Sequence, residues 1–243
     1  MSERIATVFP DVVNADSRAV QRYYKEHYNK DSVFIPYGTD LDQREPDDKV
    51  TLAKYGLVPD GYILFVGRLV PENNAHQLVA AYRRIASDKK LVIVGDAPYA
   101  DAYQAQLKRS AAGDTRIVFT GYVFGEDYKC LMRNAHTYVL ASEVGGTHPV
   151  LIEALAAGNA VIVNNIPSSL EVIGDAGIAY DGKKGADALF DVLSMLLANP
   201  DLHASLRKKA QERIRAAYLW DKVTDDFIGL FRSLVDRSNR DTP

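Results

Sequence analysis

The sequence predicts an α/β fold built on a Rossmann-like, doubly wound parallel sheet, and three observations lead to this prediction. Six short apolar runs alternate with longer amphipathic stretches. Each run is apolar at nearly every position, which is typical of strands that helices cover on both faces. A helical stretch separates most consecutive strands, as right-handed parallel crossovers require. We therefore expect about six strands in one sheet, followed by a helical C-terminus.

The expected strands are short and rich in β-branched residues. They are Tyr62–Val66, Leu91–Val94, Ile117–Thr120, Thr137–Leu140, Val161–Val163 and Ile178–Tyr180. The helices expected between them place apolar residues at helical spacing. They are Ala75–Ala86, Ala100–Ala111, Asp127–Arg133, Pro149–Ala157 and a short turn near Ser169–Ile173. Gly158 follows the fourth of these helices, where a left-handed cap is expected.

The two flanks depart from this alternation. Residues 11–38 predict two strands around one helix, which is too little to bury a core of its own. These elements are Asp11–Ala15, Ser17–Tyr28 and Ser32–Ile35. Three helical stretches follow Gly182, with Asp201 as the expected cap of the second. They are Asp187–Leu197, Asp201–Ala217 and Asp221–Arg237. We therefore divide the chain at 1–38, 39–217 and 218–243.

Composition narrows the class of protein. The 243 residues are 47% hydrophobic and 25% charged, which is close to the average of soluble globular proteins. The formal net charge is -3, so no basic excess favours nucleic-acid binding. The single cysteine, Cys130, is expected in the core and forms neither an internal disulfide nor a cysteine-built zinc site. Apolar runs are too short for a membrane span or a signal peptide, so we expect a cytoplasmic protein.

Two loops are the strongest candidates for a binding site. If the spatial strand order is 3-2-1-4-5-6, ligands bind beyond the carboxyl ends of the first and fourth strands. The exit loop of the first strand is 67–74, and that of the fourth is 142–148. With this order the two loops face each other across one crevice.

The loop after the fourth strand has the features of an anion site. Gly145 and Gly146 allow close approach of the backbone to a ligand, and Thr147 and His148 precede Pro149 at a helix start. Free N–H groups at that start favour an anion. A plain tight turn is the alternative for the glycine pair, and a cap or surface position is the alternative for His148.

Three further positions border the same crevice. Arg68 directly follows the first strand, and its guanidinium suits phosphate oxygens, unless it forms only a surface ion pair with Glu72. Glu153 lies among apolar residues and suits a ribose diol, although a helix-dipole contact is the alternative. The segment around Tyr122 and Val123 is either a plain loop or a border for a base.

Several stretches together resemble one known family, the retaining GT-B glycosyltransferases of the family 4 type, in their C-terminal donor domain. The resembling stretches are residues 67–74, 91–98, 145–158 and 168–181, with 14–17 and 33–40 upstream. Within this family, the sequences of residues 70–74 and 145–149 are most similar to a rhamnosyltransferase-like branch. The resemblance covers about 210 residues in order, which is more specific than any single motif.

The resemblance implies a nucleotide-sugar donor such as a UDP-, dTDP- or GDP-sugar, retention at the anomeric carbon and no required metal or other cofactor. Arg68 matches the family's diphosphate-binding arginine, whereas the position of its lysine falls on Asn73; we name both as catalytic residues. Glu153 matches the ribose-binding carboxylate, and the position of the other motif carboxylate falls on Gly145, with Glu143 two residues before it. The full set of expected donor-binding residues is Gly67, Tyr122, Val123, Glu143, Gly145, Gly146, Thr147 and Glu153.

The resemblance also bears on the flanks. In the family an acceptor domain precedes the segment that matches residues 11–38, so 1–38 is expected to be a remnant of that domain and the crossing strand. Region 39–217 is then the donor-binding domain, and helix 221–237 is expected to pack back on helix 17–28. The full-length form is expected either free in the cytoplasm or peripheral to a membrane.

Two alternatives remain open at this point. A non-catalytic nucleotide-sugar-binding or assembly module fits the Asn73 and Gly145 departures, and its open crevice favours self-association. A related sugar-nucleotide epimerase needs more acid–base groups than Glu143, His148 and Glu153 supply, so we rank it below the other two.

Overall fold

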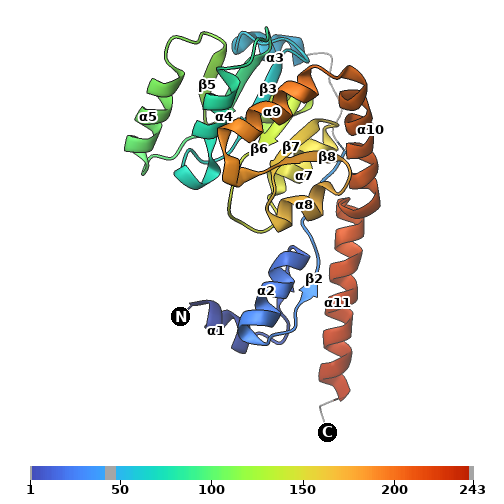
Figure 1. The fold of residues 1–243 in the computed structure, drawn as a ribbon. Coiled ribbons are helices and arrows are strands. Elements are labelled where there is room, and N and C mark those ends of the chain that lie inside the picture. Colours follow the sequence, from blue (N-terminus) through green and yellow to red (C-terminus); the bar gives the residue numbers. More distant parts are fainter. Residues whose placement is uncertain (1, 42–47, 241–243) are drawn as a thin grey trace.

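The computed structural model describes residues 2–41 and 48–240. A six-stranded sheet forms its centre, with every neighbouring pair parallel and the order β5-β4-β3-β6-β7-β8. Renumbered from β3, this order is 3-2-1-4-5-6, so the expected strand order is confirmed (Figure 1). The strands are β3 (Tyr62–Val66), β4 (Lys90–Val94), β5 (Ile117–Gly121), β6 (Thr137–Leu140), β7 (Ala160–Asn164) and β8 (Gly177–Tyr180).

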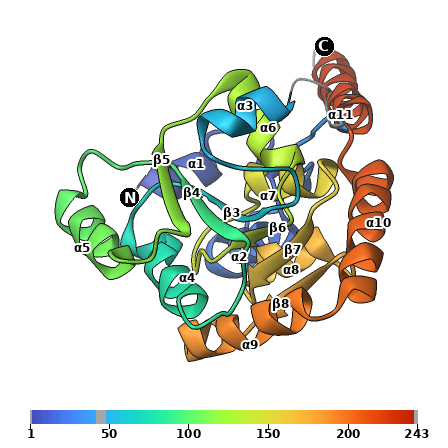
Figure 2. The same cartoon turned by 90° about the horizontal axis from the view of Figure 1, so that it is seen from above.

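Alternate strand residues enter two separate cores because successive side chains point to opposite faces. Ile63 and Phe65 of β3 join the core under α4 (Ala75–Tyr82), α5 (Asp101–Ala111) and α9 (Ala186–Leu197). Tyr62 and Leu64 join the other core. Its helices are α3 (Asp48–Lys54), α6 (Gly125–Arg133), α7 (Pro149–Ala156), α8 (Pro167–Ile173) and α10 (Pro200–Ala217). Figure 2 shows the two helical layers on either side of the sheet.

The chain also contains short elements that the sequence pattern does not reveal. α1 (Ser2–Val8), α3 and the 3-10 turn η1 (Pro71–Asn73) have seven residues or fewer, which is too short for a periodic signal. A second 3-10 turn, η2 (Gly182–Lys184), precedes α9. The expected strands of the N-terminal region shrink to β1 (Asn14–Ala15) and β2 (Val33–Phe34) around α2 (Arg18–Tyr28).

Several helix ends can be compared with their expected positions. Gly158 has a φ of +73°, so the expected left-handed cap is confirmed. α4 ends at Tyr82 because the following residues form tighter i to i−3 hydrogen bonds. The prediction that Asp201 caps α10 is wrong. The side chain of Asn199 accepts the hydrogen bond from the Leu202 N–H, and Asp201 lies inside α10.

The N-terminal segment lies below the sheet and beside α11 (Trp220–Arg240), the long terminal helix (Figure 1). The chain crosses between the two parts twice, and the two crossings are paired. Thr39 N–H donates to the Tyr218 carbonyl at 2.8 Å, and Trp220 N–H donates back to the Thr39 carbonyl at 3.2 Å. The segments near 39 and 219 therefore form one joint between the upper and lower parts.

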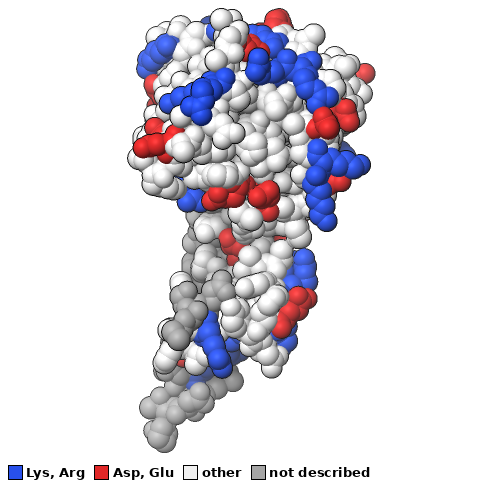
Figure 3. Space-filling view, turned by 60° about the vertical axis from the view of Figure 1, so that its left-hand side comes forward, with Lys and Arg blue, Asp and Glu red and all other residues white. Residues whose placement is uncertain are grey.

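None of the helices in the described ranges has the length and apolar character needed to cross a membrane. On the face drawn in Figure 3, positive and negative residues are interspersed over the upper part of the molecule.

Candidate functional site

The exit loops of β3 and β6 line one pocket of about 300 Å³. Gly67, Arg68 and Asn73 come from the β3 loop, and Gly145 and His148 come from the β6 loop. The remaining lining residues are Phe65, Val66, Glu72, Leu140, Ser142, Val144 and Val150. The carboxyl ends of β3 and β6 meet at the point where the strand order reverses, so the fold itself brings these loops together.

A second pocket of about 330 Å³ shares Val66, Gly67 and Arg68 with the first. Its other wall comes from the loop after β5 and from α6 and α7, and includes Tyr122, Val123 and Glu153. Gly95, Phe124 and Tyr128 also line it, together with Val94 and Gly125. Because the two pockets share three residues, they form one cleft. We call it the donor cleft, after the nucleotide-sugar donor that the family resemblance leads us to expect.

The two loops are joined by a small hydrogen-bond network. Asn73 Nδ2 donates to the Arg68 carbonyl at 2.9 Å, and Ser142 Oγ donates to Asn73 Oδ1 at 3.1 Å. Asn73 therefore holds the Arg68 backbone and connects it to the β6 loop. The Arg68 side chain is exposed, and its NH1 donates to the Tyr99 hydroxyl at 3.3 Å. The guanidinium keeps further N–H donors for a ligand.

The glycine loop is held from two sides. Gly145 has a φ of +131°, which a side chain rarely adopts, and Ser168 Oγ donates to its carbonyl at 3.0 Å. Thr147 Oγ1 donates to the Asp16 carbonyl at 2.9 Å. In the described part of the chain, the N–H groups of residues 144–148 donate no hydrogen bond that the structure records. This row of amides precedes α7, where the helix dipole favours an anion.

Glu153 lies one turn into α7 and hydrogen-bonds the Tyr128 hydroxyl. Burial and the nearby Glu153 carboxylate both raise the pKa of Tyr128, so the phenol stays protonated and donates. The Glu153 carboxylate has two oxygens, so it retains capacity to accept from a diol. Tyr122 and Phe124 lie next to it with rings stacked at 5.8 Å, and 53% and 76% of these residues are exposed. They provide an aromatic surface for a flat ring.

Glu143, Gly146 and Thr147 do not line the donor cleft as the structure describes it. Glu143 Oε2 accepts from Asn74 Nδ2 at 3.3 Å, which directs it to the start of α4. Gly146 and Thr147 lie against Asp16 of the N-terminal segment. His148 occupies the N-cap position of α7, but its side chain makes no capping hydrogen bond and lines the cleft instead.

Sequence reasoning did not assign roles to several cleft residues. Tyr128 and Tyr99, which hydrogen-bond Glu153 and Arg68, lie 25 and 31 positions away in the sequence, so no local pattern reveals them. Ser142 and Phe124 lie in two loops that the sequence itself marks as candidates. Gly95 could have been predicted from the sequence as a cleft residue, because a glycine directly after a buried strand often marks a site where another backbone or a ligand approaches closely.

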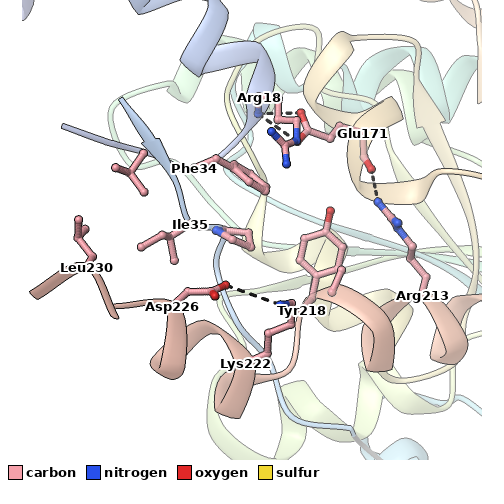
Figure 4. Close-up of a pocket in the computed structure, with 12 residues that line it drawn as sticks. Arg18, Phe34, Ile35, Glu171, Arg213, Tyr218, Lys222, Asp226 and Leu230 are labelled. Carbon is pink, nitrogen blue, oxygen red and sulfur yellow. Dashed lines mark hydrogen bonds and ion pairs between the residues drawn. The ribbon is translucent and has the colours of Figure 1, made fainter. Parts of the chain in front are cut away.

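A larger pocket of about 580 Å³ lies elsewhere, at the junction of α2, β2, α8, α10 and α11 (Figure 4). Glu171 of α8 accepts hydrogen bonds there from Arg18 N–H at 3.0 and 2.9 Å, and Arg213 NH2 donates to the Glu171 carbonyl at 2.8 Å. Lys222 and Asp226 lie 3.9 Å apart as an ion pair, and the Arg18 guanidinium lies over the Phe34 ring. The charged groups of this pocket are thus already engaged within the protein, and we interpret the pocket as a structural junction.

Comparisons with known proteins agree with this architecture. The model of the family described as "Glycosyl transferases group 1" matches residues 51–213. The O-antigen chain mannosyltransferase B of Escherichia coli is 29% identical over 189 residues, which cover 75% of this chain and 49% of that protein. The phosphatidyl-myo-inositol mannosyltransferase of Mycolicibacterium smegmatis is 29% identical over 240 residues, covering 90% and 56%. The chain spans about half the length of the curated relatives it matches.

Solved structures give the same fold. HepE of Anabaena in complex with UDP and glucose aligns with a TM-score of 0.86 at 18% identity, covering 96% of this chain and 66% of HepE. Sucrose-phosphate synthase of Thermosynechococcus elongatus aligns with a TM-score of 0.82 at 24% identity, covering 97% and 61%. These neighbours are GT-B glycosyltransferases, and the fold expectation is confirmed. Because the family model matches well over half of the sequence, this chain belongs to the group 1 glycosyl transferases.

Proposed function

We propose that this chain is the donor-binding half of a retaining glycosyltransferase and binds a nucleoside-diphosphate sugar in the donor cleft. The observation that carries the proposal is the convergence of Arg68, the Gly145 loop and Glu153 on one continuous cleft. HepE, whose structure holds UDP and glucose, supports a uridine nucleotide as the first ligand to test.

Each part of the cleft suits one part of such a donor. The Glu153 carboxylate accepts from the two ribose hydroxyls, and Tyr122 and Val123 border the base. Arg68 and the unoccupied N–H groups of Val144, Gly145 and His148 face the diphosphate. Asn73 acts through position, because it fixes the Arg68 backbone rather than adding a charge.

The proposed chemistry is electrostatic. Transfer breaks the bond between the anomeric carbon and the diphosphate oxygen and forms one between that carbon and an acceptor hydroxyl oxygen, which releases its proton. The leaving diphosphate oxygen takes the electron pair of the broken bond and gains negative charge. A guanidinium and fixed N–H dipoles stabilise that charge more than they stabilise the bound donor, which lowers the barrier. We also expect transfer to retain the configuration at the anomeric carbon and to need no metal.

Calorimetry tests the donor site directly. We expect wild type to bind one of UDP, dTDP and GDP, and Arg68→Ala to lose about 1.5–3 kcal/mol, because a charged phosphate contact is removed. Arg109→Ala is the matched control, since Arg109 lies exposed on α5, outside the cleft. Failure of all three nucleotides to bind wild type more tightly than millimolar would contradict the proposal.

A second candidate is a module that binds the donor without transferring it. The turning of Glu143 toward Asn74 favours this candidate, because the carboxylate nearest to Gly145 in sequence then stays outside the donor cleft. Donor hydrolysis or transfer by the 243-residue chain would exclude this module, because a protein that only binds the donor releases no product.

A further inference from the structure

Glu153 lies on the boundary between two cavities. On one side it lines the donor cleft together with Val66 and Tyr122. On the other side it lines a pocket of about 260 Å³ at the joint between the upper and lower parts of the molecule, together with Asp40 and Trp220. Because Glu153 is partly exposed and has a cavity on either side, packing alone does not determine where its carboxylate points.

One side chain restrains this carboxylate. The Tyr128 hydroxyl of α6 donates to Glu153 Oε2, and no other group of the described residues hydrogen-bonds or ion-pairs with the Glu153 carboxylate. The Tyr128 ring packs against the core beneath α6 and α7, so the fold sets the position of this donor. Burial and the Glu153 carboxylate both raise the pKa of Tyr128, so the phenol keeps the proton that it donates.

The restraint affects how strongly a ligand can bind to Glu153. A flexible glutamate side chain loses rotamer entropy when a ligand orders it, and this loss weakens binding. A carboxylate that a protein donor already holds has lost that freedom before the ligand arrives. The hydrogen bond from Tyr128 uses one lone pair of Oε2 and leaves Oε1 free, so the two adjacent hydroxyls of a ribose can still donate to the carboxylate.

We propose that Tyr128 is a positioning residue that orients the Glu153 carboxylate toward the ribose hydroxyls of the bound nucleotide. This inference rests on the proposed function, in which Glu153 accepts from those hydroxyls. Tyr128 acts through Glu153, so its effect on binding disappears when the ligand lacks the hydroxyls or when the protein lacks the carboxylate. These two conditions separate a positioning role from a general effect of Tyr128 on the fold.

Calorimetry with hydroxylated and dideoxy nucleotides measures what the ribose hydroxyls contribute. UDP, GDP and dTDP are titrated into the full chain, each beside its 2′,3′-dideoxy form. For the base that wild type binds, we expect the hydroxylated form to bind at least about tenfold more tightly than the dideoxy form. Tyr128→Phe removes only the phenol oxygen. It should reduce this preference to about threefold and leave the affinity for the dideoxy form within about twofold of wild type.

A double-mutant cycle shows whether Tyr128 acts through Glu153. In a Glu153→Ala background, adding Tyr128→Phe should change the affinity for either form by less than about twofold. Tyr55→Phe is the matched control, because the Tyr55 hydroxyl also donates to a carboxylate of α6, that of Asp127 at 3.1 Å, and Tyr55 lies outside the donor cleft. This control variant should keep the wild-type preference for the hydroxylated form.

Three results would overturn the positioning role. An unchanged preference in Tyr128→Phe would mean that Glu153 does not need the phenol, and equal weakening of both forms would mean that Tyr128 only maintains the cleft. A full loss from Tyr128→Phe in the Glu153→Ala background would mean that Tyr128 meets the nucleotide directly. Thermal melting of each variant shows whether a loss of affinity reflects unfolding.

Failure of the proposed function gives a different result. If wild type binds the hydroxylated and dideoxy forms equally, Glu153 does not contact the ribose, and the role of Tyr128 fails while the donor site stands. If wild type binds none of the six nucleotides, the donor site itself is contradicted, and the positioning role fails with it.

Discussion

Gly67 and Gly95 set how closely the exit loops of β3 and β4 approach each other. A Cβ on Gly95 would lie 2.0 Å from the Gly67 carbonyl oxygen, and Gly95 has a φ of +131°. Gly95 N–H also donates to the Gly121 carbonyl at 2.9 Å, which ties β4 to the end of β5. Three strand ends therefore meet through backbone alone, and this contact shapes the wall of the donor cleft.

We expect Gly95→Ala to reduce the free energy of unfolding by about 2–4 kcal/mol, because steric overlap and backbone strain add. Gly113→Ala is the control: its φ is +85°, but a Cβ there meets nothing within 4 Å, so only about 1 kcal/mol of strain is expected. Urea denaturation measures both. Equal losses at the two positions would show that the contact with Gly67 is not tight.

His136 and His203 form a stacked pair near the amino ends of β3 and β6, away from the donor cleft. Their ring centroids lie 3.8 Å apart, and His203 Nε2 hydrogen-bonds the His136 carbonyl at 2.8 Å. Burial, with the neighbouring His203, Lys89 and Arg207, lowers the pKa of His136 to about 4, while Asp60 opposes the shift. Burial also lowers the pKa of His203.

A depressed histidine pKa makes the unfolded chain bind more protons than the folded chain. The contribution of His136 to the free energy of unfolding is therefore fully present above the pKa of the unfolded chain, about 6.5. It falls as the pH drops from there toward the pKa of the folded chain, about 4. We expect the melting temperature of wild type to fall over this window, and that of His136→Phe to fall less. Calorimetric melts at pH 7, 6, 5 and 4 measure the difference. Parallel curves for the two proteins would contradict the assignment to His136.

At the scale of elements, α3 is held by a buried ion pair. Asp48 at its first turn and Arg133 at the end of α6 each have 4% of the side chain exposed. Arg133 Nε donates to Asp48 Oδ2 at 2.8 Å, and Asn134 Nδ2 donates to the same oxygen at 2.7 Å. The carboxylate is thus surrounded by donors, which offsets the cost of taking it out of water.

Removing one partner of such a pair leaves the other charge buried. We expect Arg133→Met to cost about 3–5 kcal/mol in the free energy of unfolding. Glu126→Gln alters only the second, exposed partner of Arg133, so it should cost less than about 1 kcal/mol. Denaturant titration compares them, and similar losses for the two variants would show that the buried pair contributes no more than the surface one.

The elements of the sheet could be predicted from sequence because each is defined locally. Strands buried on both faces are apolar at nearly every position, and Pro149 and Gly158 mark the ends of α7. α1 and α3 were missed, because one or two turns give no period to detect, and α3 depends on a partner 85 residues away. The cap of α10 was predicted at the wrong residue, because Asn199 and Asp201 are both good cap residues. Pro200 occupies the first helical position, which makes Asn199 the cap.

At the scale of the whole molecule, three contacts among the described residues attach the N-terminal segment to the sheet domain. The joint at Thr39 and Leu219 is the first, and the Thr147 contact with Asp16 is the second. The third is Glu171, whose carboxylate accepts hydrogen bonds from the first N–H groups of α2. α8 therefore connects the glycine loop, through Ser168, with the start of α2.

We expect Glu171→Ala to loosen α2 while the sheet domain stays folded. The first-turn N–H groups of Arg18 and Ala19 lose their acceptor, so their hydrogen exchange should accelerate at least about tenfold, which corresponds to about 1.4 kcal/mol of local stability. Glu212→Ala, an exposed change on α10, is the control. Unchanged exchange at α2 would mean that the Ser17 cap alone holds this terminus.

The sequence by itself determined the sheet, its likeness to a glycosyltransferase family and the two loops that form the cleft. These features depend on local burial patterns and on strand order, and Arg68, Gly145 and Glu153 could therefore be placed in advance. Only the tertiary structure decided which side chains face one another. It turns Glu143 toward Asn74, aligns Tyr128 with Glu153 and brings Asp16 to Gly146, because these contacts join elements whose separation in the chain leaves no local signal.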